Sequence, residues 1–281
     1  MTPARFARLR LLRTHGIGPV TWRQLMARFG EAEVALEALP SLARRGGGEA
    51  PRPADTAMIA REIETVERLG ARHVLLDDAD YPALLAELDT APPALIIRGD
   101  IGLAQRGGVA LVGARNASAA SCRFARGLAQ DLAAHAMPVT SGLARGIDTA
   151  AHIGARLAGE AGREVMAVPG HPADPRAQGC NMLIREGATL IQSAGDILEQ
   201  IRPIDPRMVR APGSAYTPPP PDEANDADRR RVTDLLGPVA VTVDELIRQS
   251  GRPPAIVQTV LLELELAGRL ERHAGGRVAL A

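Results

Sequence analysis

The 281-residue sequence predicts an α/β fold, with a parallel-sheet core between a helical N-terminal region and a C-terminal winged helix. Two apolar runs, residues 109–112 and 137–140, each end at a glycine-containing turn and lead into an alanine-rich amphipathic segment. Such runs are typical of parallel strands that feed crossover helices. Near the C-terminus, two helical patterns followed by two alternating strand patterns predict the winged helix.

Residues 1–70 form the predicted N-terminal helical domain. A tight glycine turn at residues 16–18, Pro19 near a helix start and a closing Gly30 resemble a helix-hairpin-helix turn. The exposed amides of such a turn can contact a nucleic-acid phosphate, and the alternative is a turn that only joins two packed helices. Residues 44–53, which contain three consecutive glycines, are expected to form a flexible break.

The first 30 residues carry six arginines and no acidic residue. This segment could contact a phosphate backbone, and the alternative is a solvated helix face. Trp22 and Phe29 are expected to lie in the core of the helical domain rather than to stack on bases.

Residues 71–201 form the predicted α/β domain, and residues 202–227, with four consecutive prolines, form a semi-rigid linker. Strands are expected near residues 73–76, 94–98, 108–112, 137–141, 164–168 and 188–192. Helices are expected near residues 117–135, 147–160 and 180–186.

Residues 228–281 form the predicted winged helix. Thr242 begins a capping box for a helix that ends at Gln249, and a second helix runs from the prolines at 253–254 to Ala267. A hairpin of residues 269–273 and 277–280 follows. The second helix carries two glutamates, Glu263 and Glu265, and no arginine, so we expect the module to serve as a protein contact or packing unit rather than to read DNA sequence.

The turns at residues 112–116 and 141–148 are the predicted ligand-binding feature. Both follow strands, so both lie at the carboxyl edge of the sheet, where ligands bind in open α/β folds. Their glycines let backbone amides approach an anion, and the helix N-terminus that follows favours negative charge. Arg115 and Arg145 add one bidentate phosphate donor to each turn. The sequence therefore predicts phosphate recognition at this edge.

Composition excludes several kinds of phosphate site. All 33 basic residues are arginine, so neither a P-loop lysine nor a lysine Schiff base is possible. A Gly-x-Gly-x-x-Gly fingerprint follows neither strand, which argues against a dinucleotide-binding dehydrogenase. The net charge is zero, so no global field attracts nucleic acid or a membrane surface.

The two cysteines, Cys122 and Cys180, fit neither a disulfide framework nor a metal site with close spacing. No apolar run approaches the roughly 20 residues needed to cross a bilayer, and no signal-peptide core is present. We therefore expect a cytoplasmic protein without a cofactor or a metal.

Three motifs occur in a specific order: VGAR at residues 112–115, TSGLARGIDTAAH at 140–152, and VPG at 168–170 followed by GCNMLIREGA at 179–188. With them the chain resembles the bacterial DNA-processing protein A family (DprA/Smf) over nearly its whole length. The resemblance implies a Rossmann-like DNA-binding domain between a helical N-terminal domain of the SAM or helix-hairpin-helix type and a winged helix.

The resemblance further implies a non-catalytic protein that binds and protects incoming single-stranded DNA and helps to load the RecA recombinase during natural transformation. Family members commonly act as homodimers. The matched residues implied to line the DNA-backbone pocket are Gly113, Arg115, Asn116, Ser141, Gly142, Arg145 and Gly146.

The chain departs from the family pattern after about residue 155. Where the family continues into a further strand, a basic loop and another strand, this sequence passes directly into GREV at residues 162–165. We therefore expect a shortened sheet and fewer phosphate contacts. The implied homodimer would be lost if the missing strands formed its interface.

Four other functions fit the sequence less well. A nucleotide-binding enzyme of the phosphoribohydrolase type would carry PGGxGT, whereas residues 169–173 are PGHPA. A hydrolase built on Ser141, Asp148 and His152 lacks the nucleophile elbow, and Asp148 is placed as a helix N-cap. A winged-helix regulator would prefer duplex DNA. An inactive, truncated member of the family is the remaining alternative.

Overall fold

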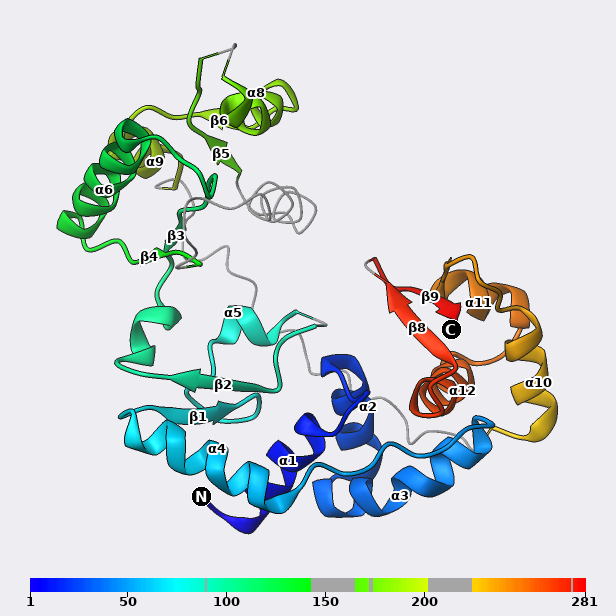
Figure 1. Cartoon of the computed structure of the whole chain (residues 1–281). Helices are drawn as coiled ribbons and strands as arrows, with labels where there is room; N and C mark the ends of the chain where they lie inside the picture. Colours follow the sequence, from blue (N-terminus) through cyan, green and yellow to red (C-terminus); the bar gives the residue numbers. More distant parts are fainter. Residues whose placement is uncertain (89, 143–164, 172–173, 202–223, 274) are drawn as a thin grey trace. The chain divides into compact units, whose positions relative to one another are not determined.

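The computed structural model divides into two compact units. Unit 1 combines Met1–Ile101 with Tyr216–Ala281, and unit 2 is Gly102–Ala215. The structure describes residues 1–88, 90–142, 165–171, 174–201, 224–273 and 275–281 (Figure 1). The expected helix at 147–160 and residues 202–223 of the expected linker 202–227 lie outside this description, and the domain boundaries stay predictions.

Four helices begin unit 1, and their ends follow from local sequence. They are α1 (Pro3–Arg13), α2 (Pro19–Phe29), α3 (Ala32–Arg45) and α4 (Thr56–Arg68). As predicted, α2 starts at a proline and is followed by Gly30. The φ of Gly30 is 72°, a positive value that glycine adopts more readily than other residues. Trp22 is a core residue, 4% exposed, and its Nε1 donates to the carbonyl of Arg8 at 3.2 Å.

The first two strands belong to unit 1. β1 (Arg72–Leu75) and β2 (Ala94–Ile97) pair antiparallel, and the short helix α5 (Ala83–Ala86) lies between them in the chain. The strands expected at these positions are confirmed. They join the N-terminal helices, however, because α4 packs against β1 and Leu75 is buried with Leu9 and Ile59.

Arginines of α1 pair with carboxylates of unit 1. Arg13 donates to both oxygens of Glu62 at 2.9 and 2.7 Å, and Arg5 donates to Asp78 Oδ2 at 2.8 Å. The Arg13 hydrogen bonds hold the pKa of Glu62 below its usual value, although partial burial opposes the shift. Arg8 pairs with Asp77. Three of the six arginines in the first 30 residues are thus paired with carboxylates of the protein, which weakens the case for a phosphate-binding arm.

The C-terminal part of unit 1 is a winged helix, as predicted. Its elements are α10 (Asp226–Asp234), β7 (Val241–Thr242), α11 (Val243–Ser250), α12 (Pro254–Leu266), β8 (Leu270–His273) and β9 (Arg277–Leu280), and the strand order is β7-β9-β8. The Thr242 hydroxyl accepts from the amide of Glu245 at 3.3 Å and caps α11. Local capping and proline signals therefore set both helix starts.

Helix α12 is buried on two sides. Val257, Val260 and Leu261 pack in the core of the winged helix, while Leu262 and Leu266 pack in the core of the N-terminal helices, beside α3. This packing agrees with the expectation of a packing unit, while the role of the module in the protein stays a prediction. Because most of its surface is covered, it is not available to lie in a major groove in this structure.

Glu263 is the charged centre of this packing. Its side chain is 1% exposed and accepts from Arg229 Nε and Nη2 at 2.8 and 3.1 Å. Arg45 Nε, at the end of α3, lies 3.3 Å from Glu263 Oε1. A buried carboxylate is tolerated only with such partners, because an unpaired charge in the interior is costly.

The glycines after α3 are a contact surface, and the expectation of a flexible break is wrong for them. A Cβ at Gly46 would lie 2.0 Å from the carbonyl oxygen of Glu263, and a Cβ at Gly48 would lie 2.3 Å from that of Ala267. Arg269 Nη1 also donates to the Gly46 carbonyl at 3.0 Å. The sequence pattern missed this role because the contacting residues lie more than 200 positions away.

Unit 2 holds the predicted parallel strands. β3 (Val109–Ala110) pairs with β4 (Val139–Thr140), and β5 (Met166–Ala167) pairs with β6 (Thr189–Leu190). The helices are α6 (Ala119–Ala134), α8 (Gln178–Arg185) and α9 (Ala194–Ile201), with 3-10 turns at Ile101–Gln105 and Pro175–Ala177. Within the described residues, the parallel strands form two separate pairs instead of one continuous sheet.

One hydrophobic core joins the elements of unit 2. Leu128 and Leu132 of α6 pack with Val109 of β3, and Ile197 of α9 belongs to the same cluster. Figure 1 shows α6 and α9 side by side. This packing fixes where the chain leaves β3 and enters α6.

Gly46→Ala is expected to destabilise unit 1 by about 1–3 kcal/mol, because the added methyl group overlaps the α12 backbone. Chemical unfolding followed by the fluorescence of Trp22, the single tryptophan and a core residue of this unit, measures the change. Gly237→Ala is the control, since nothing lies within 4 Å of its Cβ position, and its effect should stay within about 0.5 kcal/mol. Equal stability of the two variants would contradict the close packing.

Glu263→Gln is expected to cost about 3 kcal/mol, because it leaves the Arg229 and Arg45 guanidinium groups without their buried counter-charge. The same fluorescence assay applies. Glu271→Gln makes the same chemical change at an exposed position of β8 and should leave unfolding almost unchanged. A Glu263→Gln protein as stable as this control would show that the ion pairs contribute nothing.

Candidate nucleic-acid interface

The pairing of β3 with β4 brings the two predicted turns to one edge. Val109 lies opposite Val139, Ala110 lies opposite Thr140, and the amide of Leu111 donates to the Thr140 carbonyl at 2.8 Å. Because the strands run parallel, the chain leaves both at the same end of the pair. The turn after β3 and the residues that follow β4 therefore start side by side.

The turn after β3 presents polar groups ahead of a helix. Gly113 is half-buried, while Arg115 and Asn116 are exposed. Helix α6 then begins, and the Ser118 hydroxyl caps it by accepting from the amide of Ser121 at 3.1 Å. A glycine turn followed by a helix N-terminus offers amide dipoles to an anion.

The turn after β4 is described only at its start. Ser141 and Gly142 are both exposed. The other two candidates in this turn, Arg145 and Gly146, lie outside the residues that the structure describes. The structure thus brings five of the seven candidate residues to one edge, and their role in binding stays a prediction.

Asn181 is a positioning residue to which the sequence interpretation gave no role. Its Oδ1 accepts from the amide of Gly170 at 3.0 Å, and its Nδ2 donates to the Gly170 carbonyl at 3.0 Å. The two bonds tie the turn after β5 to helix α8. An asparagine near a helix start, downstream of a Pro-Gly turn, was the available signal, since its amide can serve a backbone donor and acceptor together.

The edge after β6 carries negative charge. Asp196 accepts from the amides of Gln192 and Ser193 at 2.7 and 3.0 Å at the start of α9. The Gln192 amide and the Ser193 hydrogen bonds lower the pKa of this carboxyl group. An ionised carboxylate here leaves the end of the β3–β4 pair as the better place for an anion.

No helix in the described part of the chain combines the length and the apolar character that a membrane crossing requires.

The three parts of the chain define a class of modular protein: a helix-hairpin-helix domain, an α/β domain with glycine-containing turns after two parallel strands, and a winged helix. Family models match in the same order. The DprA-like N-terminal HHH domain matches residues 3–65, DNA recombination-mediator protein A matches residues 72–156 and 153–202, and the DprA winged helix domain matches residues 216–276. The chain belongs to the DprA/Smf family of DNA-processing proteins.

The chain is similar to several proteins named Smf or DprA. Protein Smf of Escherichia coli K12 is 27% identical and aligns 74% of this chain with 77% of its own length. Protein Smf of Synechocystis is 30% identical, over 49% of this chain and 37% of the relative. The DNA processing protein DprA of Streptococcus pneumoniae R6 is 25% identical, over 52% and 78%. The X-ray structure of the S. pneumoniae protein aligns at 23% identity with a TM-score of 0.43, over 52% of this chain and 78% of that chain.

The alignments also support the shortened core. The recombination-mediator model matches as two pieces that meet at residues 153–156. The alignment to the E. coli relative has 292 positions but uses 74% of the 281 residues here, or about 208. The S. pneumoniae alignment has 226 positions and uses 52%, or about 146. In both cases about 80 positions of the alignment have no residue of this chain.

Asn181→Ala is expected to loosen the turn after β5, because both hydrogen bonds to Gly170 are lost, at about 1–2 kcal/mol together. Hydrogen–deuterium exchange of a peptide spanning residues 165–171 should then quicken by roughly tenfold. Gln178→Ala removes an exposed amide side chain from the same helix and is the matched control. Exchange that is unchanged in both variants would contradict the proposed effect of the two Asn181–Gly170 hydrogen bonds on this turn.

Proposed function

We propose that this protein binds single-stranded DNA, without catalysis, through the turns that follow β3 and β4. The observation that carries the proposal is the parallel pairing of these strands, which starts both turns at one edge. Membership of a family described as a DNA recombination mediator supports DNA as the ligand. The names of the relatives, DNA processing protein and Smf, agree with such a role.

In this proposal the DNA backbone is held by phosphate contacts. Arg115 supplies a guanidinium group, and the amides near Gly113 and at the start of α6 supply neutral donors. The chain has only six aromatic residues, and Trp22 is buried, so base stacking contributes little. Binding therefore depends on salt and has little sequence preference.

The proposed setting is the cytoplasm, where the protein protects DNA that enters during natural transformation and hands it to the RecA recombinase. The shortened core sets a limit on this activity. Each phosphate contact that is missing lowers the slope of log affinity against log salt by roughly 0.7 for a single strand. Affinity is therefore weaker than in a family member with the complete sheet, and homodimerisation depends on surfaces outside the missing segment.

The Arg115→Ala, Arg145→Ala double variant is expected to lose single-stranded DNA binding, because each substitution removes one phosphate donor from a turn. Fluorescence anisotropy of a labelled oligothymidylate, and of a duplex of the same length, across a salt series measures the effect. Arg185→Ala, at an exposed position in the last turn of α8, is the control for loss of positive charge in unit 2.

A preference for the single strand that the double variant abolishes and the control retains would support the proposal. A folded wild-type protein that binds neither oligonucleotide would instead identify an inactive family member, in which the absent segment carried the activity. This second candidate is favoured by the two-piece match at residues 153–156. Duplex preference would contradict both.

A further inference from the structure

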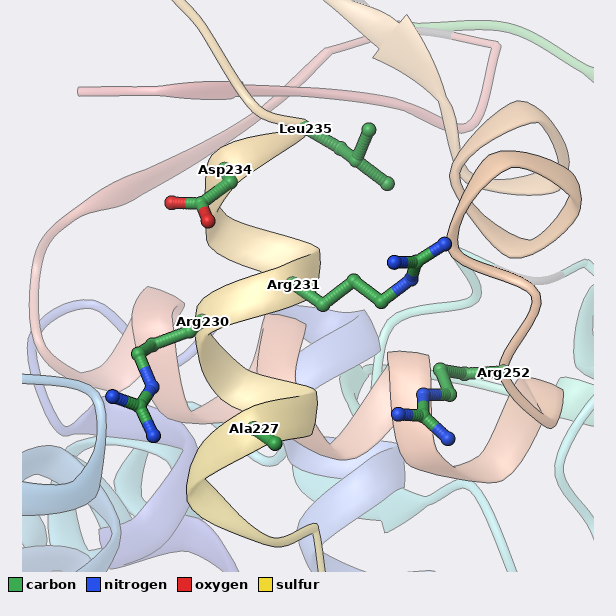
Figure 2. Close-up of a pocket in the computed structure, with 6 residues that line it drawn as sticks. All are labelled: Ala227, Arg230, Arg231, Asp234, Leu235 and Arg252. Atoms are coloured by element: carbon green, nitrogen blue, oxygen red, sulfur yellow. The ribbon is translucent and has the colours of Figure 1, made fainter.

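One surface of the winged helix carries three arginines and has no lining residue from α12. Helix α10 and the turn between α11 and α12 surround an open hollow of about 510 Å³. Figure 2 shows the side chains around it. The lining residues are Ala227, Arg230, Arg231, Asp234, Leu235 and Arg252.

Two of the three arginines are anchored by a hydrogen bond from Nε, and the third forms an ion pair at this atom. Arg231 donates to the Ser250 carbonyl at 2.7 Å, and Arg230 donates to the Asp226 carbonyl at 3.2 Å. Arg252 Nε lies 2.9 Å from Asp228 Oδ1. Among the described residues, no hydrogen bond joins the Nη atoms of these arginines to another group. Anchoring at Nε limits side-chain freedom and leaves the terminal amino groups for a ligand.

We propose that this hollow binds phosphate groups of a DNA backbone, as a second contact outside the turns of unit 2. Guanidinium groups fit phosphate oxygens in a bidentate manner. The hollow is open rather than enclosed, which suits a chain that runs across the surface better than a small anion that must be surrounded. The proposal takes DNA as the partner from the proposed function, but its residues lie in different elements.

Neighbouring carboxylates limit the strength of this contact. Arg252 is paired with Asp228, and Arg229, on the same helix, is paired with Glu263 and Asp226. Arg230 and Arg231 are anchored by carbonyl groups instead, so they keep most of their charge for a phosphate. Asp234 on the rim repels phosphate, so its removal strengthens binding.

The test uses the full chain and the labelled oligothymidylate in a salt series. Arg230→Gln with Arg231→Gln removes two phosphate contacts and lowers the salt slope by about 1.4. Between about 50 and about 200 mM salt, the ratio of wild-type to variant affinity then shrinks about sevenfold. Arg61→Gln with Arg68→Gln is the matched control, because both residues are exposed on α4 and lie outside the hollow.

Asp234→Asn provides a gain of function that loss of folding cannot imitate, since affinity at low salt should rise above that of the wild type. Circular dichroism melting checks that all variants stay folded. A slope change in the hollow variant equal to that of the control, together with no gain for Asp234→Asn, would overturn the proposal.

Comparison with Arg115→Ala separates the two proposals. If Arg115→Ala weakens binding and the hollow variants do not, the hollow is refuted and the function proposed for unit 2 stands. If the hollow variants alone change the salt slope, the hollow binds DNA and the proposed function of the turns fails. A wild-type protein that binds no oligonucleotide refutes both.

Discussion

The buried carboxylate of Glu263 is the constraint on which unit 1 depends. It lies on α12, and it holds Arg229 of the winged helix and Arg45 of the N-terminal helices at the same point. Because the Glu263 carboxylate is 1% exposed, its charge is tolerated only while these arginines are in place. Specific electrostatic pairing and the close approach of Gly46 thus determine how α12 meets α3.

The same packing determines which surfaces of unit 1 are accessible to DNA. The second helix of a winged helix is its usual reading element, and here it is mostly buried. The N-terminal arginines Arg5 and Arg13 pair with Asp78 and Glu62. The two candidates that we propose are the turn bearing Arg115 at the end of β3 and the hollow beside α10.

Local signals predicted helices well and long-range pairing poorly. Pro19 and Gly30 bounded α2, and Thr242 marked the start of α11, because capping and proline effects act within a few residues. The sequence also predicted that the turns at residues 112–116 and 141–148 follow strands. It could not predict that β1 pairs with β2 in unit 1, or that Asn181 clamps Gly170, because these contacts depend on tertiary packing.

The chain order of unit 1 has a consequence for how the protein is made and how it tolerates change. Unit 1 is formed by the two ends of the chain, and unit 2 is inserted between them. During synthesis on the ribosome, the N-terminal helices cannot pack against α12 until α12 has been made. The hydrogen bond between Thr21 and Glu265, which are 244 positions apart, therefore forms late in synthesis. The shortening near residue 155 falls wholly inside the insertion. The packing of α3 against α12 lies outside that insertion, so a change of length there leaves these contacts in place.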